Sequence, residues 1–487
     1  MSKSPPESSR SNPAAHLATG ATMDENAGNG DLFSLPGLSR PSPHGGFPPH
    51  ELFPQVAYEL VHDELLLDGT SRMNLATFCT TWVDDQARRL MAESLDKNIV
   101  DKDEYPQTAA LEQRCVRMLA DLWHAPDPGS TLGTSTTGSS EAAMLGGLAA
   151  KFRWRAAGGT GTPNLVSGPV QVCWEKFCRY FDVELRQIPL RGDRYTLHAD
   201  DLAAHCDENT IAVVPTFGQT FTGLFEDVAA ISAELDRLHA AGGPDIPIHV
   251  DAASGGFLAP FTAPDLVWDF RLPRVKSINA SGHKTGLAPL GVGWAIWREA
   301  ADLPRELIFD VDYLGGSMPT FNLNFSRPGG QAITQYYEFI RLGRAGYTRV
   351  QSAISVVARH FARGLAEAGP FTLIHDGHPS AGITAVSWRL DGPQDFNLYD
   401  LSDRLRARGW LIAAYPLPHD RQDETIMRAV FRHGFTIDMA DQLLADVRRA
   451  LDQLARHPVR SSLTRDEAGG FTHDARPAVP VTPPGPR

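Results

Sequence analysis

Short runs of β-branched residues alternate with longer stretches of helical periodicity through most of this chain. The clearest strands are 211–214 and 246–250, and polar or glycine-rich turns follow them at 215–223 and 251–256. This alternation is typical of βαβ units around a parallel sheet. Open α/β sheets bind ligands at the carboxyl ends of their strands, so we predict that these two turns help to build a site.

The alternation does not extend over the whole chain. Residues 1–49 are rich in Ser, Pro, Gly, Asn and Ala and bury too little surface to offset the entropy of ordering. Further elements are expected at strand 383–388 and at helices 350–368, 398–408 and 439–456. The expected organisation is a flexible N-terminal arm 1–49, an N-terminal segment 50–72, a large domain 73–346, a small α+β domain 347–460 and a flexible, Pro-rich tail 461–487.

Composition excludes several classes of function. The 487 residues carry a net charge of −13, which argues against nonspecific binding of nucleic acid or of anionic membranes. The chain has neither a run of about 18 uncharged apolar residues nor a secretory signal, so a cytoplasmic protein is expected. The 5 cysteines form no CxxC pair, and the tail has no basic amphipathic helix. Disulfides, zinc and calmodulin binding are therefore not expected, and a small-molecule substrate fits better.

Lys284 stands out by its context, although most lysines are solvated surface charges. It follows Ser281, Gly282 and His283 and precedes the strand-like run 292–297. This placement could hold the amine in a cleft, where desolvation lowers the pKa and makes the amine nucleophilic. The segment 282–285 resembles a phosphate-binding P-loop only superficially, because His283 separates the glycine from the lysine.

Three other segments supply what a pyridoxal 5′-phosphate (PLP) site needs beside a lysine. Asp251 closes the strand 246–250, where it could pair with a protonated pyridine nitrogen or serve only as a turn cap. The segment 133–141 runs into a helix and could bind phosphate, or it could be a well-capped helix start without a ligand. The turn 215–223 offers hydroxyl groups near the same edge, or is a plain loop.

Four long segments, 133–155, 249–261, 281–298 and 312–330, closely resemble those of bacterial and plant glutamate decarboxylases. These enzymes belong to the group II PLP-dependent decarboxylases. The resemblance covers residues 50–460 and implies an α/β fold of the aspartate aminotransferase-like type (fold type I). That fold has a large domain with a mainly parallel sheet and a smaller α+β C-terminal domain.

The resemblance also implies roles for individual residues. Lys284 would form the internal aldimine, Asp251 would pair with the pyridine nitrogen, and both would be catalytic together with His283. The other residues expected to contact PLP are Ser139, Ser140, Gln171, Thr220, Ala253, Ser281 and, from the neighbouring subunit, Ser326. The residues expected to bind substrate are Thr77, Phe78, Asn98, Asp101 and Arg428, the last pairing with a substrate carboxylate. His473 would close the site at neutral pH, or is a tail histidine without a role.

The implied reaction is decarboxylation of L-glutamate to 4-aminobutyrate (GABA) and CO₂, which consumes one proton. A role in acid resistance or GABA metabolism follows as a hypothesis, and Asp101 near the substrate suggests an acidic optimum. The cross-subunit contact of Ser326 requires at least a homodimer, and a hexamer is also compatible. Two alternatives remain open: decarboxylation of aspartate, cysteine sulfinate or an aromatic amino acid, and a noncatalytic binding protein with the PLP fold.

Overall fold

The computed structural model describes residues 51–311, 318–418, 420–457, 461–464 and 467. The chain divides into two units, Met1–Gly69 and Thr70–Arg487. The described part of the first unit contains helix α1 (Pro54–Leu65), which begins with a proline at a position where the missing N–H costs no helical hydrogen bond. The predicted arm 1–49 and most of the predicted tail 461–487 lie outside the described residues.

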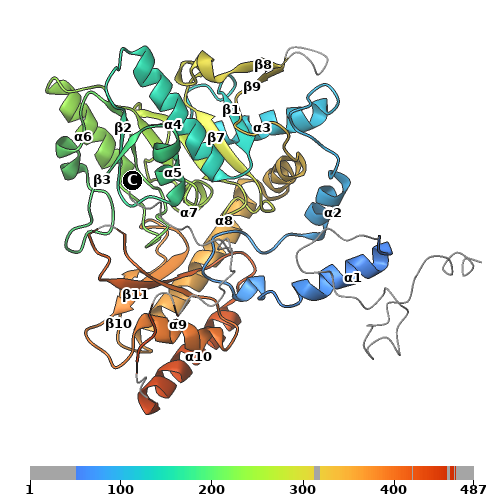
Figure 1. Cartoon of the computed structure of the whole chain (residues 1–487), viewed down its shortest axis with the longest axis vertical. Coiled ribbons are helices and arrows are strands. Elements are labelled where there is room, and N and C mark those ends of the chain that lie inside the picture. The colour runs from blue at the N-terminus through green and yellow to red at the C-terminus, as the bar shows by residue number, and fades with distance from the viewer. Residues whose placement is uncertain (1–50, 312–317, 419, 458–460, 465–466, 468–487) are drawn as a thin grey trace, which may run out of the picture. The chain divides into compact units, whose positions relative to one another are not determined.

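A seven-stranded sheet forms the centre of the second unit (Figure 1). Its strands, in spatial order, are β1 (Gly133–Thr136), β7 (Gly293–Trp297), β6 (Val275–Ser281), β5 (Ile248–Asp251), β4 (Thr210–Val214), β2 (Asn164–Ser167) and β3 (Glu184–Gln187). The strands β6, β5, β4, β2 and β3 are parallel, whereas β7 runs antiparallel to both β1 and β6. The predicted mainly parallel sheet is confirmed.

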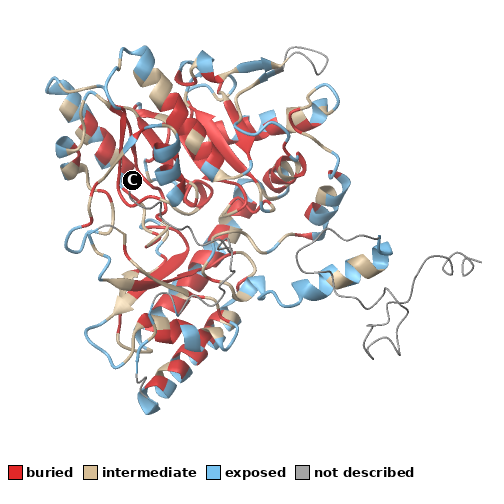
Figure 2. Cartoon of the chain, in the orientation of Figure 1, coloured by how far each residue is buried: buried red, intermediate tan, exposed pale blue. Residues whose placement is uncertain are grey.

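Helices cover both faces of this sheet. Successive residues of a strand point to opposite faces, and Leu165 and Val166 of β2 accordingly pack into two different hydrophobic clusters. One cluster includes residues of α4 (Ser139–Ala156) and α5 (Val172–Tyr180); the other includes residues of α3 (Pro106–Leu122) and α6 (Val228–Ala240). Burial on both faces explains why the strands read as apolar runs, and Figure 2 shows the buried residues along them.

The C-terminal part of the second unit contains a four-stranded antiparallel sheet, as the predicted α+β fold requires. Its strands, in spatial order, are β10 (Phe371–His375), β11 (Ala385–Leu390), β13 (Thr425–Val430) and β12 (Ala413–Pro416). The helices α9 (Leu398–Arg406) and α10 (Ile437–Arg456) pack on it. The long helix α8 (Gly330–Ala366) joins the two sheets, because Phe339 packs in the core of the large sheet and Phe361 in that of the small sheet.

The remaining elements are short. They are η3 (Ser71–Met73), α2 (Asp85–Glu93), η4 (Ala199–Ala204), α7 (Ala259–Thr262), η5 (Ala300–Asp302), η6 (Arg305–Leu307) and the two-stranded pair β8 (Phe309–Val311) and β9 (Met318–Thr320). None of the helices in the described ranges is long and apolar enough to cross a membrane.

Several element boundaries differ from the prediction, most of them by no more than two residues, and two of the differences have a clear physical cause. Strand β5 begins at Ile248 and not at residue 246, and the residue before it, Pro247, has no N–H to donate to a neighbouring strand. Helix α8 begins at Gly330 and not at residue 350, because it continues through a kink at Gly343 (φ 55°) that interrupts the helical pattern. The predicted border between residues 346 and 347 falls inside α8, and the domain boundaries stay predictions.

Candidate active site

A cavity of about 560 Å³ opens at the carboxyl edge of the large sheet. The segments that follow β1, β4, β5 and β6 meet there, and β13 of the small sheet reaches it as well. Most of the predicted site residues line this cavity: Thr77, Phe78, Ser139, Ser140, Gln171, Thr220, Asp251, Ala253, His283, Lys284 and Arg428. Its volume lies within the usual range for small-molecule and cofactor sites.

Lys284 enters the cavity three residues after the end of β6. Its Nζ donates a hydrogen bond to Ser254 Oγ (3.2 Å) and lies 5.0 Å from the centre of the Phe78 ring. Burial lowers the pKa of the Lys284 amine, and the negative charge of Asp251 opposes this shift only in part. A larger fraction of the amine is therefore unprotonated and nucleophilic than for a solvated lysine.

Asp251 is the last residue of β5, and its buried carboxylate also lines the cavity. It accepts hydrogen bonds from Trp174 Nε1 (2.8 Å), Asn279 Nδ2 (3.0 Å) and the Ala253 N–H (3.1 Å). Behind Asn279, the His249 ring lies 2.8 Å from the amide oxygen. These donors compensate the carboxylate for the hydrogen bonds to water that it loses on burial.

The start of α4 forms a cradle for an anion. The helix begins at Ser139, and the N-cap residue Gly138 has no side chain that could occupy the first N–H groups. Ser281 Oγ donates to Ser139 Oγ (2.7 Å), which connects β6 to the cradle. A Cβ atom on Gly293 would lie 2.3 Å from the carbonyl carbon of Gly138, so β7 can pass this close only with a glycine there.

His283 lies at the same end of the cavity as Lys284. Its Nδ1 accepts a hydrogen bond from the Val292 N–H (3.2 Å), so the ring proton belongs on Nε2. Burial, and after it the charge of Lys284, lowers the pKa of His283 to about 4. The ring is therefore neutral near neutral pH and can donate through Nε2.

Gln171 and the loop that contains Thr220 line the same cavity. Gln171 caps α5, with its side-chain oxygen accepting from the Cys173 N–H (2.7 Å). The Thr220 loop is held from behind by Glu226, which accepts from the Thr216 N–H (2.7 Å) and from Gln219 Nε2 (3.1 Å). Burial raises the pKa of Glu226 to about 7.

Arg428 brings a positive charge from β13 into the cavity. The side chain is buried, and burial lowers the pKa of its guanidinium. Its Nη2 donates to the Ala76 carbonyl (2.6 Å), and the guanidinium carbon lies 4.2 Å from the centre of the Phe78 ring. Its Nε, although buried, has no hydrogen-bond partner among the described residues. An anionic ligand in the cavity would satisfy this donor.

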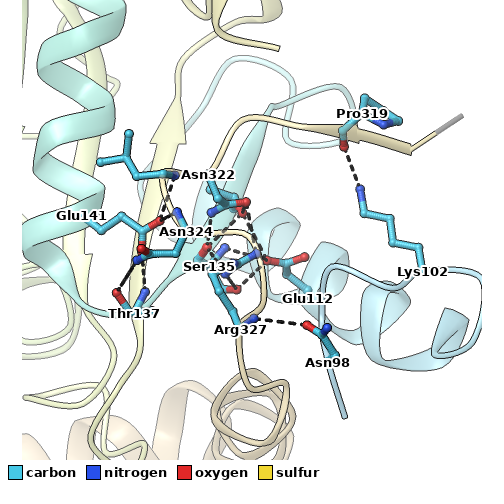
Figure 3. A network of polar contacts seen from close by, with 12 residues as sticks. Asn98, Lys102, Glu112, Ser135, Thr137, Glu141, Pro319, Asn322, Asn324 and Arg327 are labelled. Atoms are coloured by element: carbon cyan, nitrogen blue, oxygen red, sulfur yellow. Dashed lines mark hydrogen bonds and ion pairs between the residues drawn. The ribbon is translucent and has the colours of Figure 1, made fainter. Parts of the chain in front are cut away.

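Four predicted residues within the described ranges are not among those that line the cavity: Asn98, Asp101, Ser281 and Ser326. Asn98 Nδ2 donates to Ser326 Oγ (3.4 Å), and Asn98 Oδ1 accepts from the Arg327 N–H (3.2 Å). Figure 3 shows Asn98 and Arg327 in a polar network that includes the buried Glu112. Asp101 accepts from the Glu104 N–H (3.2 Å). His473 lies outside the described residues.

Several residues of the site were missed by the sequence reasoning. They are Trp174, Thr216, Glu226, His249, Asn279 and the arginine-contacting Tyr415. A signal existed for Asn279, because it precedes Ser281 by two residues on one strand and therefore shares its face. Tyr415 carried no local signal, because its contact with Arg428 depends on the pairing of two strands.

The comparisons with known proteins agree with this geometry. A family model, the pyridoxal-dependent decarboxylase conserved domain, matches residues 49–391. The chain therefore belongs to the pyridoxal-dependent decarboxylase family, whose cofactor is PLP.

Three similar proteins show which members of the family this chain resembles. A glutamate decarboxylase of Aliivibrio fischeri is 56% identical over 450 residues, which are 91% of this chain and 97% of that protein. The glutamate decarboxylase beta of Listeria innocua is 45% identical over 433 residues, covering 87% of this chain and 93% of that protein. The solved glutamate decarboxylase of Lactobacillus brevis CGMCC 1306 has a TM-score of 0.82 at 46% identity, covering 86% of this chain and 97% of that chain.

The residues of the cavity fit PLP. The lysine amine suits its aldehyde, the Asp251 carboxylate suits a protonated ring nitrogen, and the start of α4 suits its phosphate. Two polar atoms of cavity-lining residues, Thr216 Oγ1 and Arg428 Nε, are buried without a partner among the described residues. Buried polar atoms of this kind are expected where a ligand completes the hydrogen bonding.

Proposed function

We propose that this chain decarboxylates L-glutamate to 4-aminobutyrate and CO₂ in the cytoplasm and consumes one proton in each turnover. The observation that carries the proposal is the single cavity that gathers Lys284, Asp251, the start of α4 and the partly unpaired Arg428. The names of the similar proteins support glutamate as the substrate. Because the reaction removes a proton, it suits acid resistance or GABA metabolism.

In this proposal the large sheet supplies the residues that hold the cofactor. Lys284 carries it through its ε-amino group, and Asp251 keeps a proton on its ring nitrogen. The phosphate is held by the N–H groups at the start of α4 and by the polar side chains of Ser139, Ser140, Ser281 and His283. Gln171, Thr220 and Ala253 surround the ring. When bound, PLP supplies the electron sink for the bond that breaks.

The small sheet and the segment before α2 supply the residues that hold the substrate. Arg428 pairs with a substrate carboxylate through the free Nε and the remaining donors of its guanidinium fork. Thr77 and Phe78 form the wall beside it. Once CO₂ has left, Lys284 in its ammonium form is placed to return a proton to Cα. Its pKa is lowered by burial, so it gives up a proton more readily than a solvated lysine does.

Substrate preference tests the activity directly. The rate of CO₂ release is to be measured on glutamate, aspartate, tyrosine and cysteine sulfinate with one preparation. Glutamate should give by far the largest kcat/KM, in line with the similar proteins, and tyrosine should be a poor substrate because it has no second carboxylate for Arg428. Equal rates on all four, or turnover of tyrosine alone, would remove the assignment to glutamate.

We further propose that the chain acts as a homodimer at least, in which Ser326 and Asn98 of a second copy complete the cavity. Within one chain the two side chains are hydrogen-bonded to each other, and Ser326 is exposed and does not line the cavity. Asn98 contacts both Ser326 and Arg327, so Asn98 and Ser326 would enter a neighbouring site together. Asp101, three residues after Asn98, would come close to the same substrate.

Hybrid dimers test this shared site. A Lys284→Ala chain is to be coexpressed with a Ser326→Asp chain, in which an added carboxylate repels the phosphate. If Ser326 acts across the interface, each hybrid dimer keeps one intact site, and random pairing should restore about a quarter of wild-type activity. If Ser326 acts within its own chain, or not at all, the hybrid restores nothing beyond what the Ser326→Asp chain has alone.

A further inference from the structure

Tyr415 is placed beside Arg428 by the register of the small sheet. In the antiparallel pair of β12 and β13, Ala413 is opposite Arg428 and Tyr415 is opposite Ile426. Residues two apart on a strand share a face, so Tyr415 is the diagonal neighbour of Arg428. The Arg428 guanidinium carbon lies 5.5 Å from the centre of the Tyr415 ring and 4.2 Å from the centre of the Phe78 ring.

Tyr415 is itself held in place by a loop of the large sheet. Its hydroxyl donates to the Phe221 carbonyl (2.6 Å), and the two rings meet edge to face with their centres 6.3 Å apart. Phe221 directly follows Thr220, which lines the cavity. Tyr415 does not line the cavity, so any effect on the substrate has to pass through Arg428 or this loop.

The buried charge of Arg428 has to be stabilised while its N–H donors stay free for a substrate, and aromatic rings can do this. A buried guanidinium needs compensation for lost water, but a carboxylate placed there would occupy the donors that a substrate carboxylate must use. No carboxylate among the described residues forms an ion pair with Arg428, and a single backbone carbonyl takes one donor. Aromatic faces stabilise a cation without consuming its N–H groups.

We propose that Tyr415 is a positioning residue for substrate binding. Its ring, together with that of Phe78, keeps the buried Arg428 guanidinium charged, oriented and free to bind the substrate carboxylate. The inference rests on the proposed function, since it takes Arg428 as the group that binds the substrate. It adds that substrate affinity depends on a contact across the small sheet and on the anchor of Tyr415 at Phe221.

Substitutions at Tyr415 separate this role from a purely structural one. Tyr415→Leu removes the aromatic face and should raise KM for glutamate about tenfold or more, with a smaller change in kcat, because binding energy common to substrate and transition state is lost. Tyr415→Phe keeps the ring and loses only the anchor, so its KM should lie between those of the wild type and Tyr415→Leu. The exposed Tyr180 of α5 gives matched controls, Tyr180→Leu and Tyr180→Phe, which should leave KM unchanged.

The absorbance of bound PLP and the thermal unfolding temperature are to be recorded for every variant. A folded, PLP-loaded Tyr415→Leu enzyme with wild-type KM, or with only kcat reduced, would overturn the inference. If that variant does not fold, phenylalanines of increasing fluorination at position 415 give the same test, because fluorine weakens the cation contact and preserves the ring. KM should then rise with each fluorine, and a flat series overturns the inference.

Glutamate turnover by the wild type, measured in the same assay, distinguishes a failure of the proposed function from a failure of the role of Tyr415. If it does not turn over glutamate, the proposed function fails. If it does, and KM does not respond to the ring at position 415, only the role of Tyr415 fails.

Discussion

The two sides of the cavity are built in different ways. The cofactor side consists of short segments directly after strands of the large sheet, such as Asp251 at the end of β5 and Lys284 after β6. The substrate side joins segments that are distant in sequence, and the hydrogen bond from Arg428 to Ala76 spans 352 residues. Parallel strands bring their carboxyl ends to one edge by topology alone, whereas the substrate side requires two sheets to meet.

This difference also appears in how the charges are stabilised. Asp251 is surrounded by N–H donors from three residues, so its charge is supported before any ligand arrives. Arg428 has one fixed hydrogen bond, two aromatic neighbours and an unpaired Nε. The cofactor side is therefore preorganised for a permanent partner, and the substrate side keeps donors free for a partner that leaves.

We expect the largest effect on activity from Asp251→Asn, a substitution on the cofactor side of the cavity. The substitution preserves shape but removes the charge that pairs with the ring nitrogen, so kcat should fall about a hundredfold or more. Steady-state CO₂ release measures this. The exposed Asp265→Asn is the matched control and should be fully active. A loss below tenfold in the Asp251 variant would mean that the ring nitrogen needs no buried carboxylate.

A smaller effect is expected from Arg428→Lys, on the substrate side. Lysine keeps the charge but not the planar fork, so KM should rise about tenfold to a hundredfold, with a smaller change in kcat. Cofactor absorbance should stay unchanged, because this residue does not hold PLP in the proposal. Arg359→Lys on the exposed face of α8 serves as control. A variant that loses PLP and keeps its KM would contradict the separation of the two sides.

The smallest effect is expected on the free energy of unfolding. It comes from a feature that both sheets share, a buried histidine. Burial lowers the pKa of His249 in β5 and of His375 in β10 below the ordinary value of 6.5. The neutral form is favoured in the folded state, so this stability is fully present above pH 6.5 and is lost as the pH falls below it. Each histidine contributes at most about 1.4 kcal/mol per pH unit to that loss.

Urea unfolding of the PLP-loaded enzyme between pH 7 and pH 5, roughly the range in which an ordinary histidine titrates, measures this slope. His375→Gln should flatten it, and His239→Gln at an exposed position of α6 should not. An unchanged slope in the His375 variant would show that folding does not lower the pKa of this histidine.

Much of the cofactor side could be predicted from sequence, because each of its segments is continuous and ends a strand. Ser139, Asp251 and Lys284 meet at one cavity, as the strand pattern predicts for residues at carboxyl ends. Their supporting residues were harder to find. Trp174 contacts Asp251 from helix α5, and its distance in sequence does not reveal that contact; only Asn279 carried a signal, its spacing from Ser281 on β6.

The substrate side was only partly predictable. Arg428 and Phe78 were expected from the family resemblance, but Tyr415 was not, because its place depends on the register of β12 and β13. The pairing of Asn98 with Ser326 was also not foreseen, since it joins residues 228 apart. The expected contact of Ser326 with PLP from a neighbouring subunit and the expected contact of Asn98 with the substrate stay predictions.

In our proposal, Lys284 carries the cofactor in an enzyme that acts on glutamate. Borohydride reduction fixes PLP to the lysine that holds it, and peptide mapping then identifies that lysine, with glutamate turnover measured on the same preparation before reduction. We expect one labelled site, Lys284, and full loss of turnover on labelling. Lys284→Ala should show neither label nor turnover, whereas the control Lys276→Ala should keep both. A label on another lysine, or glutamate turnover by Lys284→Ala, would contradict it.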